Sequence, residues 1–279
     1  YKKLLFISLA ILLVALIYLV LFYLKTGDIM RKDVSLSGGT SITVFSEADT
    51  NELENFLKNK LENINIRTLQ DITSRKQIAF VVDTSSQVDE AKKILEEFLD
   101  FKLTEENSST EITGSLLSKA FYKQFIMAII AAFILMAVII FIIFKVPVPS
   151  LAIILAAFTD LVVTLAIINI VNFRVSIAGI AAFLMLIGYS IDTDTMLTTK
   201  ALKRREDKLN TRIGKAFKTG LTMTLTSLVA VLLGYIIAQA FVLKQIFFIL
   251  SVGLSIDVIS TWLGNAAILK WYCEKKGIN

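Results

Sequence analysis

The stretch LLFISLAILLVALIYLVLFYL, residues 4–24, contains no charged residue. A helix of this length rises about 1.5 Å per residue and crosses the roughly 30 Å hydrocarbon core of a bilayer. Lys2 and Lys3 precede the stretch and Lys25 follows it, which is also the charge order of a secretory signal peptide. A signal peptide has a shorter apolar region that ends at a small-residue cleavage site. The stretch therefore predicts an uncleaved first transmembrane helix.

The rest of the chain is also too apolar for an ordinary soluble domain. Hydrophobic residues make up 55% of the 279 residues, and the mean hydropathy is +0.70. Five more apolar runs are long enough to cross a membrane: residues 125–144, 151–171, 175–197, 221–243 and 246–270. The links between them are short, except for the link at 200–218, and Pro147 and Pro149 mark the first. The sequence predicts an α-helical membrane protein with six transmembrane helices.

The distribution of Lys and Arg predicts the orientation of these helices. The link 200–218 carries eight basic residues, and its side of the membrane collects 14 in all, whereas the opposite short links hold only Arg174 and Lys244. We expect both termini and this link in the cytoplasm and residues 25–123 outside. A topology signal explains the basic link without nucleic acid, and an amphipathic helix on anionic membrane lipid is the alternative.

Residues 25–123 have the pattern of one small outer domain with a net charge of −4, whereas the remainder carries +9. The predicted elements are a strand at 40–45, a helix at 50–61, strands at 64–69 and 77–82, a helix at 86–99 and a strand within 102–113. Ser86 and Asp89 have capping spacing at the start of the second helix. This βαββαβ order predicts an α+β ferredoxin-like domain. We therefore divide the chain into a first helix (1–24), this domain (25–123) and five helices (124–279).

Composition excludes several kinds of chemistry. The chain has no histidine, and its single cysteine, Cys273, cannot form an internal disulfide. It also lacks a nucleotide-binding P-loop. We expect no cofactor, no metal site and no enzymatic activity.

Four acidic residues lie inside the predicted spans: Asp160, Asp192, Asp194 and Asp257. A carboxylate in hydrocarbon costs about 2.5–3.5 kcal/mol on insertion scales. Asp160 and Asp257 fall near the midplane, where they form either a structural hydrogen bond between helices or part of a proton or ion path. Asp192 and Asp194 fall near the inner end of the fourth span, where an interfacial helix end is the alternative.

Asp192 and Asp194 point in different directions on a helix, because two residues correspond to about 200°. Both lie at the depth of a threonine-rich face of the fifth span, formed by Lys218, Thr222 and Thr226. A Lys or hydroxyl group beside an aspartate favours the charged carboxylate, so that loss of the contact would couple proton binding to helix movement. The alternative for these threonines is hydrogen bonding within their own helix.

Two short motifs accompany this arrangement. Gly188-Tyr189-Ser190 precedes the acids of the fourth span, and Gly38-Gly39-Thr40 follows the first helix, where the glycines also predict a tight turn. Together with one helix, an outer domain and five helices, these motifs resemble the SecF family, part of the resistance-nodulation-division superfamily. The segment 192-DTD-194 resembles archaeal members. Where bacterial members carry an acid, this chain has Thr193, and where they carry an Arg early in the fifth span it has Thr219.

The resemblance implies an accessory subunit of the Sec protein-export translocon. Such a subunit acts with SecD beside the SecY-type channel on the translocating polypeptide, coupled to proton or ion flow through the membrane part. A passive scaffold for SecD and a small-molecule transporter of the same superfamily are the competing interpretations. An intramembrane aspartyl protease using Asp160 and Asp257 is disfavoured, because the glycine that such enzymes place beside the acid is missing.

Overall fold

The structure is a computed structural model that describes residues 2–278 except 71–75, 203–207 and 239. Part of the predicted basic link, 203–207, therefore lies outside the described residues. The chain forms two compact units. One comprises Lys32–Ile126 with Val175–Ile177, and the other comprises Tyr1–Arg31, Met127–Arg174 and Ala178–Asn279. Each unit is described by itself below.

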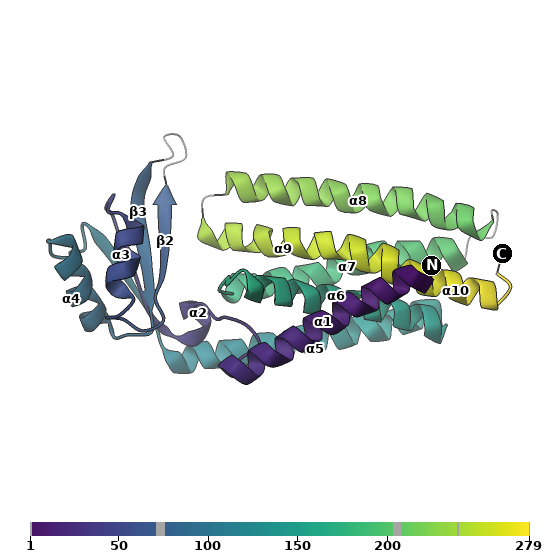
Figure 1. Ribbon diagram of the computed structural model, residues 1–279, viewed down its shortest axis with the longest axis horizontal. Coiled ribbons are helices and arrows are strands. Elements are labelled where there is room, and N and C mark those ends of the chain that lie inside the picture. The colour runs from purple at the N-terminus through teal and green to yellow at the C-terminus, as the bar shows by residue number, and fades with distance from the viewer. Residues whose placement is uncertain (1, 71–75, 203–207, 239, 279) are drawn as a thin grey trace. The chain divides into compact units, whose positions relative to one another are not determined.

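The first unit is a four-stranded antiparallel sheet with two helices on one face (Figure 1). Its elements are α2 (Val34–Ser37), β1 (Gly39–Val44), α3 (Thr50–Leu57), β2 (Asn65–Gln70), β3 (Gln77–Thr84), α4 (Val88–Leu99) and β4 (Ser108–Thr113). The strand order is β2-β3-β1-β4, and all three pairs are antiparallel. The predicted ferredoxin-like βαββαβ fold is confirmed.

Alternation along the strands builds the core of this unit. In β1 every second residue is buried, so Ile42 and Val44 face the helices. Phe80 of β3 packs into the same core, together with Leu53 of α3 and Leu95 of α4. Burying one large aliphatic or aromatic side chain stabilises a fold by roughly 1.5–3 kcal/mol. These contacts hold both helices on one face of the sheet, and the polar side chains of Ser41, Arg67 and Asp83 lie on the other.

Two local predictions for this unit have different outcomes. The expected turn at Gly38 and Gly39 is confirmed, because their φ angles are 80° and 141°. A Cβ atom on Gly39 would lie 2.3 Å from the carbonyl oxygen of Thr84, so no other residue fits there. The expected capping by Ser86 is wrong: α4 begins after Gln87, which makes no side-chain cap. The Ser86 hydroxyl instead accepts a hydrogen bond from the Glu62 N–H.

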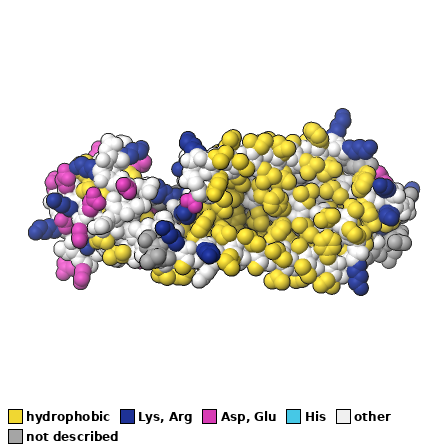
Figure 2. All heavy atoms as spheres, turned by 90° about the horizontal axis from the view of Figure 1, so that it is seen from below, with side chains coloured by type: hydrophobic (Ala, Val, Ile, Leu, Met, Phe, Trp, Pro, Cys, Tyr) yellow, Lys and Arg dark blue, Asp and Glu magenta, His cyan; other side chains and the backbone are white. Residues whose placement is uncertain are grey.

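The second unit is a bundle of long apolar helices (Figure 1). Six segments of the described chain are long and apolar enough to cross a membrane, which confirms the predicted class. They are α1 (Lys2–Thr26), α5 (Ser115–Phe144), α6 (Pro147–Ile170), α7 (Ile177–Leu202), α8 (Leu209–Ile237) and a last one composed of α9 (Phe241–Ile259), η1 (Ser260–Asn265) and α10 (Ala266–Lys275). Figure 2 shows hydrophobic side chains covering the face of this bundle, with Lys and Arg mainly near its ends.

Helix boundaries differ from the predicted spans where polar residues continue a helix. α8 begins at Leu209, twelve residues before the predicted start at 221. The polar pair Lys244-Gln245 was expected to separate the last two spans but lies inside α9. Gln245 is buried and donates a 2.6 Å hydrogen bond to the backbone oxygen of Arg174, which allows the helix to continue through it.

The bundle packs around α6, α7 and the last segment. Ile153 and Ala157 of α6 pack with Ile187 of α7. Close to the cytoplasmic end predicted for α7, Leu197 packs against Trp262 of η1. The segment η1 is a π-helical turn, in which the Ala266 N–H donates to the Thr261 oxygen five residues back. Such turns often occur at functional sites.

Candidate functional site

Three buried carboxyl groups from different helices meet inside the bundle. Asp160 comes from α6, Asp194 from α7 and Asp257 from α9, and each has 0% of its surface exposed. They are linked through the side chains of Ser190, Ser260, Thr261 and Asn265. We call these seven residues the carboxyl cluster.

Asp160 accepts hydrogen bonds from two helices. The Ser190 hydroxyl of α7 donates to its Oδ2 at 2.6 Å. The Ser260 hydroxyl of η1 donates to its Oδ1. Asp160 therefore joins α6 to both neighbours, which is the structural helix–helix hydrogen bond expected as one alternative for this residue.

Asp194 and Asp257 share one donor. The Thr261 hydroxyl lies 2.9 Å from Asp194 Oδ1 and 3.2 Å from Asp257 Oδ1. The side-chain amide of Asn265 also donates to Asp194 Oδ1, at 2.7 Å. Among the described residues, the Oδ2 atoms of Asp194 and Asp257 have no hydrogen-bond partner. Each carboxyl therefore retains an acceptor that the protein leaves unfilled.

The carboxyl cluster has no cationic partner among the residues that the structure describes. Within the described part of the chain, neither Lys nor Arg forms an ion pair with Asp160, Asp194 or Asp257. Carboxylates inside a membrane are normally paired with one another, with donors or with cations, because hydrocarbon does not solvate them. Three carboxyl groups supported only by neutral donors suit a site where a small cation or a proton compensates the charge.

The π-helical turn explains why so many donors converge. Ser260 and Thr261 are adjacent residues, yet one reaches Asp160 and the other reaches Asp194 and Asp257. Asn265, at the other end of η1, reaches Asp194 as well. The extra residue in a π turn changes the direction of the side chains relative to the helices before and after it. The turn thus supplies three donors to one side of the last span.

The structure separates the two acids of α7. Asp194 lies in the carboxyl cluster, whereas Asp192 is exposed and lines a groove between α5 and α7 with Thr195, Thr199 and Lys200. The two acids therefore face different surroundings, as their spacing predicts. Of the motif Gly188-Tyr189-Ser190, Ser190 belongs to the cluster, whereas Tyr189 is 40% exposed.

The predicted face of α8 does not join the cluster. Lys218, Thr222 and Thr226 are all exposed. The hydroxyl of Thr222 donates to the Lys218 oxygen at 2.8 Å, and that of Thr226 donates to the Thr222 oxygen at 2.9 Å. These are hydrogen bonds within one helix, which was the alternative prediction for these threonines. The buried threonine of α8 is Thr224, whose hydroxyl lies 3.5 Å from that of Thr193.

Sequence reasoning missed three members of the cluster, Ser260, Thr261 and Asn265. The last span reads SIDVISTWLGN at residues 255–265, and Thr261 and Asn265 follow Asp257 at intervals of four. Residues four apart lie on one helical face. That spacing was the available signal, whereas the π turn that adds Ser260 leaves no mark in the sequence.

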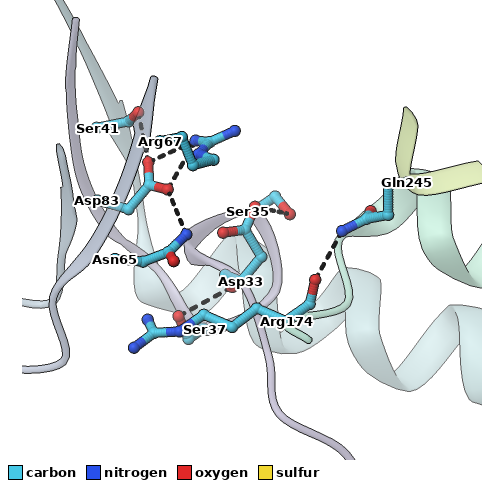
Figure 3. A network of polar contacts seen from close by, with 9 residues as sticks. All are labelled: Asp33, Ser35, Ser37, Ser41, Asn65, Arg67, Asp83, Arg174 and Gln245. Atoms are coloured by element: carbon cyan, nitrogen blue, oxygen red, sulfur yellow. Dashed lines mark hydrogen bonds and ion pairs between the residues drawn. The ribbon is translucent and has the colours of Figure 1, made fainter. Parts of the chain in front are cut away.

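Another buried carboxylate, Asp83, lies in the ferredoxin-like unit, and its hydrogen-bond partners differ from those of the carboxyl cluster. Asp83 points toward Ser41, Asn65 and Arg67 on the sheet face away from the helices (Figure 3). Its Oδ1 accepts from Ser41 at 2.7 Å and from Arg67 at 2.8 Å, and its Oδ2 accepts from Asn65 at 3.2 Å. Arg67 also lies 2.7 Å from Oδ2. Both oxygens are filled, which indicates a structural role.

The remaining motif lies in the same unit. The hydroxyl of Thr40 donates to the Ser86 oxygen at 3.0 Å, directly after the Gly38-Gly39 turn. Among the described residues no group of three His, Cys, Asp or Glu side chains has the geometry of a metal site. Neither unit thus offers a ready divalent-metal centre within the described ranges.

The fold and the cluster together define a polytopic membrane protein with a ferredoxin-like domain inserted after the first helix. A family model described as "Protein export membrane protein SecD/SecF, C-terminal" matches residues 90–275. The chain belongs to the SecD/SecF family of protein-export membrane proteins.

Individual relatives agree with this assignment. The protein-export membrane protein SecF of Methanothermobacter thermautotrophicus is 36% identical, over 98% of this chain and 93% of its own. The SecF of Methanolacinia petrolearia is 31% identical, over 99% and 95% respectively. The crystal structure of SecDF, a translocon-associated membrane protein from Thermus thermophilus, matches with a TM-score of 0.73 and 19% identity. That match covers 98% of this chain and 38% of the SecDF chain, so it shows a common fold for about a third of that protein.

Proposed function

We propose that this chain is an accessory subunit of the Sec protein-export machinery that works with SecD and couples proton binding at the carboxyl cluster to polypeptide translocation. Membership of the SecD/SecF family and the SecF relatives support the export role. The partnership with SecD is supported by the solved SecDF chain, of which this chain matches 38%. A separate SecD would supply the rest of such an assembly.

The proposed orientation follows from the basic residues. Both termini and the link 200–218 face the cytoplasm and its anionic lipid, and the ferredoxin-like unit lies outside. In that position the unit could meet a polypeptide leaving a SecY-type channel, and the carboxyl cluster would lie within the membrane between the two aqueous phases.

One observation carries the proposal of proton coupling. The Thr261 hydroxyl has a single hydrogen but lies within hydrogen-bond distance of two carboxyl oxygens, Asp194 Oδ1 and Asp257 Oδ1. A hydroxyl can donate one hydrogen and accept others. When Thr261 donates to Asp194, its contact with Asp257 is favourable only if Asp257 carries a proton and donates to the hydroxyl oxygen. The geometry thus offers a place for one proton among three carboxyl groups.

Proton arrival or departure at this place would alter the packing of three helices. The cluster joins α6, α7 and the last span through short hydrogen bonds. Losing the proton would add a second negative charge beside Asp194, and like charges in a medium of low dielectric constant repel strongly. Separation of the helices relieves that repulsion, so protonation and helix position are linked.

The experiment replaces Asp194 and Asp257 singly by Asn and follows export of a secreted reporter in cells. We expect export to fall at least tenfold, which corresponds to a loss of about 1.4 kcal/mol of driving free energy. Asp89→Asn, an exposed acid in α4, is the matched control. Export at the wild-type rate in both variants, with the SecD complex still recovered by co-purification, would reject the coupling and leave a passive scaffold.

A further inference from the structure

A small cavity lies beside the carboxyl cluster, between α1, α6 and η1. Its lining includes Ser8, Thr159, Ser260, Gly264 and Asn265. The cavity has a volume of about 10 Å³. A buried water molecule requires about 10–15 Å³ and two to four polar partners. The size and the lining therefore both match a single water.

Asn265 provides the strongest indication of a ligand. The residue is 1% exposed, and its Nδ2 donates to Asp194 Oδ1 at 2.7 Å. Its Oδ1 has no hydrogen-bond partner among the described residues. The opposite orientation of the amide would place Oδ1 against a carboxyl oxygen, so it offers no remedy. An unpaired buried carbonyl group destabilises the fold, and a donor in the cavity would remove that cost.

Helix α1 closes this cavity because residue 264 is a glycine. A Cβ atom there would lie 2.7 Å from the Ser8 hydroxyl oxygen. The close approach brings a polar side chain of the first helix to the edge of the cluster. Ser8 is 7% exposed, so its hydroxyl is held away from bulk solvent on the same side as Asn265.

We propose that the cavity binds one water molecule that orients Asn265 and relays protons to Asp160. The water donates to Asn265 Oδ1 and to the Ser260 oxygen and accepts from the Ser8 hydroxyl, three bonds in all, as is usual for buried water. A proton arriving on this water passes to Ser260, whose own hydrogen moves to Asp160 Oδ1. The water and the serine are left neutral, and the Asp160 carboxylate becomes a carboxylic acid that passes the proton on to the neighbouring Asp257.

This inference rests on the proposed proton coupling. It assigns the route by which protons reach the carboxyl cluster to the side of the bundle next to α1. The route needs space for water more than it needs the Ser8 hydroxyl. Ser8→Val fills the space, whereas Ser8→Ala removes the hydroxyl and leaves the space open. The two variants therefore separate a water site from a direct role of the serine.

The test uses the purified complex with SecD and infrared spectroscopy of the carbonyl band of protonated carboxylic acids. The measured quantity is the rate at which the band shifts after transfer from H₂O to D₂O. We expect Ser8→Val to slow the shift about tenfold, which corresponds to about 1.4 kcal/mol of added barrier. Ser8→Ala should stay within about threefold of wild type, since that corresponds to less than 1 kcal/mol. Ser255→Ala is the control, because that exposed serine donates only within its own helix.

Other outcomes are equally decisive. An unchanged rate in Ser8→Val would overturn the water site, and the proposed function would stand if Asp194→Asn still abolished export. Equal slowing in Ser8→Val and Ser8→Ala would also overturn it, by assigning the effect to the hydroxyl. A complex without any protonated carboxyl band would overturn the relay and the proton coupling together.

Discussion

Asp83 in the ferredoxin-like unit and Asp194 in the helix bundle are both buried carboxylates, yet their surroundings differ. Asp83 has a cation, Arg67, and donors on both oxygens. Asp194 has only neutral donors on Oδ1, and its Oδ2 is unpaired among the described residues. The first arrangement stabilises a fixed charge, whereas the second leaves a charge that a proton could neutralise.

The supply of hydrogen-bond partners to a buried carboxylate distinguishes the structural site from the functional one. A buried ion pair is costly to break, since removal of one partner leaves an uncompensated charge. A buried carboxyl group with too few donors is costly to maintain unless it changes its protonation state or gains a ligand. The same residue type therefore predicts a stability defect in one unit and a functional defect in the other.

The largest expected effect is on the stability of the ferredoxin-like unit. Asp83→Ala removes the buried carboxylate that Arg67 contacts, so the unit should lose about 3 kcal/mol. Amide hydrogen exchange along β3 in the full chain should become about 100-fold faster, because local opening follows the loss of stability. Glu105→Ala, an exposed acid in a turn, should change nothing. Unchanged exchange in Asp83→Ala would remove the distinction between the two sites.

An intermediate effect is expected from Thr261→Val, which keeps the shape of the side chain and removes the shared hydroxyl. Hydrogen bonds to charged groups contribute about 1.5–3 kcal/mol, so export should fall about tenfold. The melting temperature of the SecD complex should change little, because the side chain keeps its shape and the Asn265 amide still donates to Asp194. A large fall in melting temperature with a proportional fall in export would instead make Thr261 a structural residue.

The smallest effect is expected from Asp192→Asn. Asp192 faces the groove between α5 and α7 and does not contact the carboxyl cluster. The infrared carbonyl band of the SecD complex should therefore keep its wild-type intensity. A clear loss of the band would instead place Asp192 among the groups that hold the proton.

Much of the fold could be predicted from the sequence, because long apolar runs and strand alternation are local patterns. Helix ends were less predictable: Lys244 and Gln245 look like a link, but the amide of Gln245 finds a backbone acceptor in Arg174. The individual acids Asp160, Asp194 and Asp257 could be selected because charge is rare in hydrocarbon. Their convergence in one cluster could not be predicted, because it depends on the packing of three helices.

The side chains that donate to these carboxyl groups were also only partly predictable from the sequence. Thr261 and Asn265 follow Asp257 at helical spacing, which the sequence displays, but Ser260 reaches Asp160 through a π turn that no periodicity predicts. In α8 the sequence suggested contacts that the structure does not form: the regular face of Lys218, Thr222 and Thr226 was predicted to lie beside the aspartates. Those hydroxyls bond within their own helix, as threonines in helices often do.

The central claim is that the carboxyl cluster holds one proton, at Asp257 when Thr261 donates to Asp194. The most direct measurement is the infrared carbonyl band of protonated carboxylic acids in the purified SecD complex, compared between wild type and Asp257→Asn. We expect the wild type to show a band from a buried carboxylic acid and the variant to lose it. A band that is absent from the wild type, or that persists unchanged in Asp257→Asn, would contradict the claim.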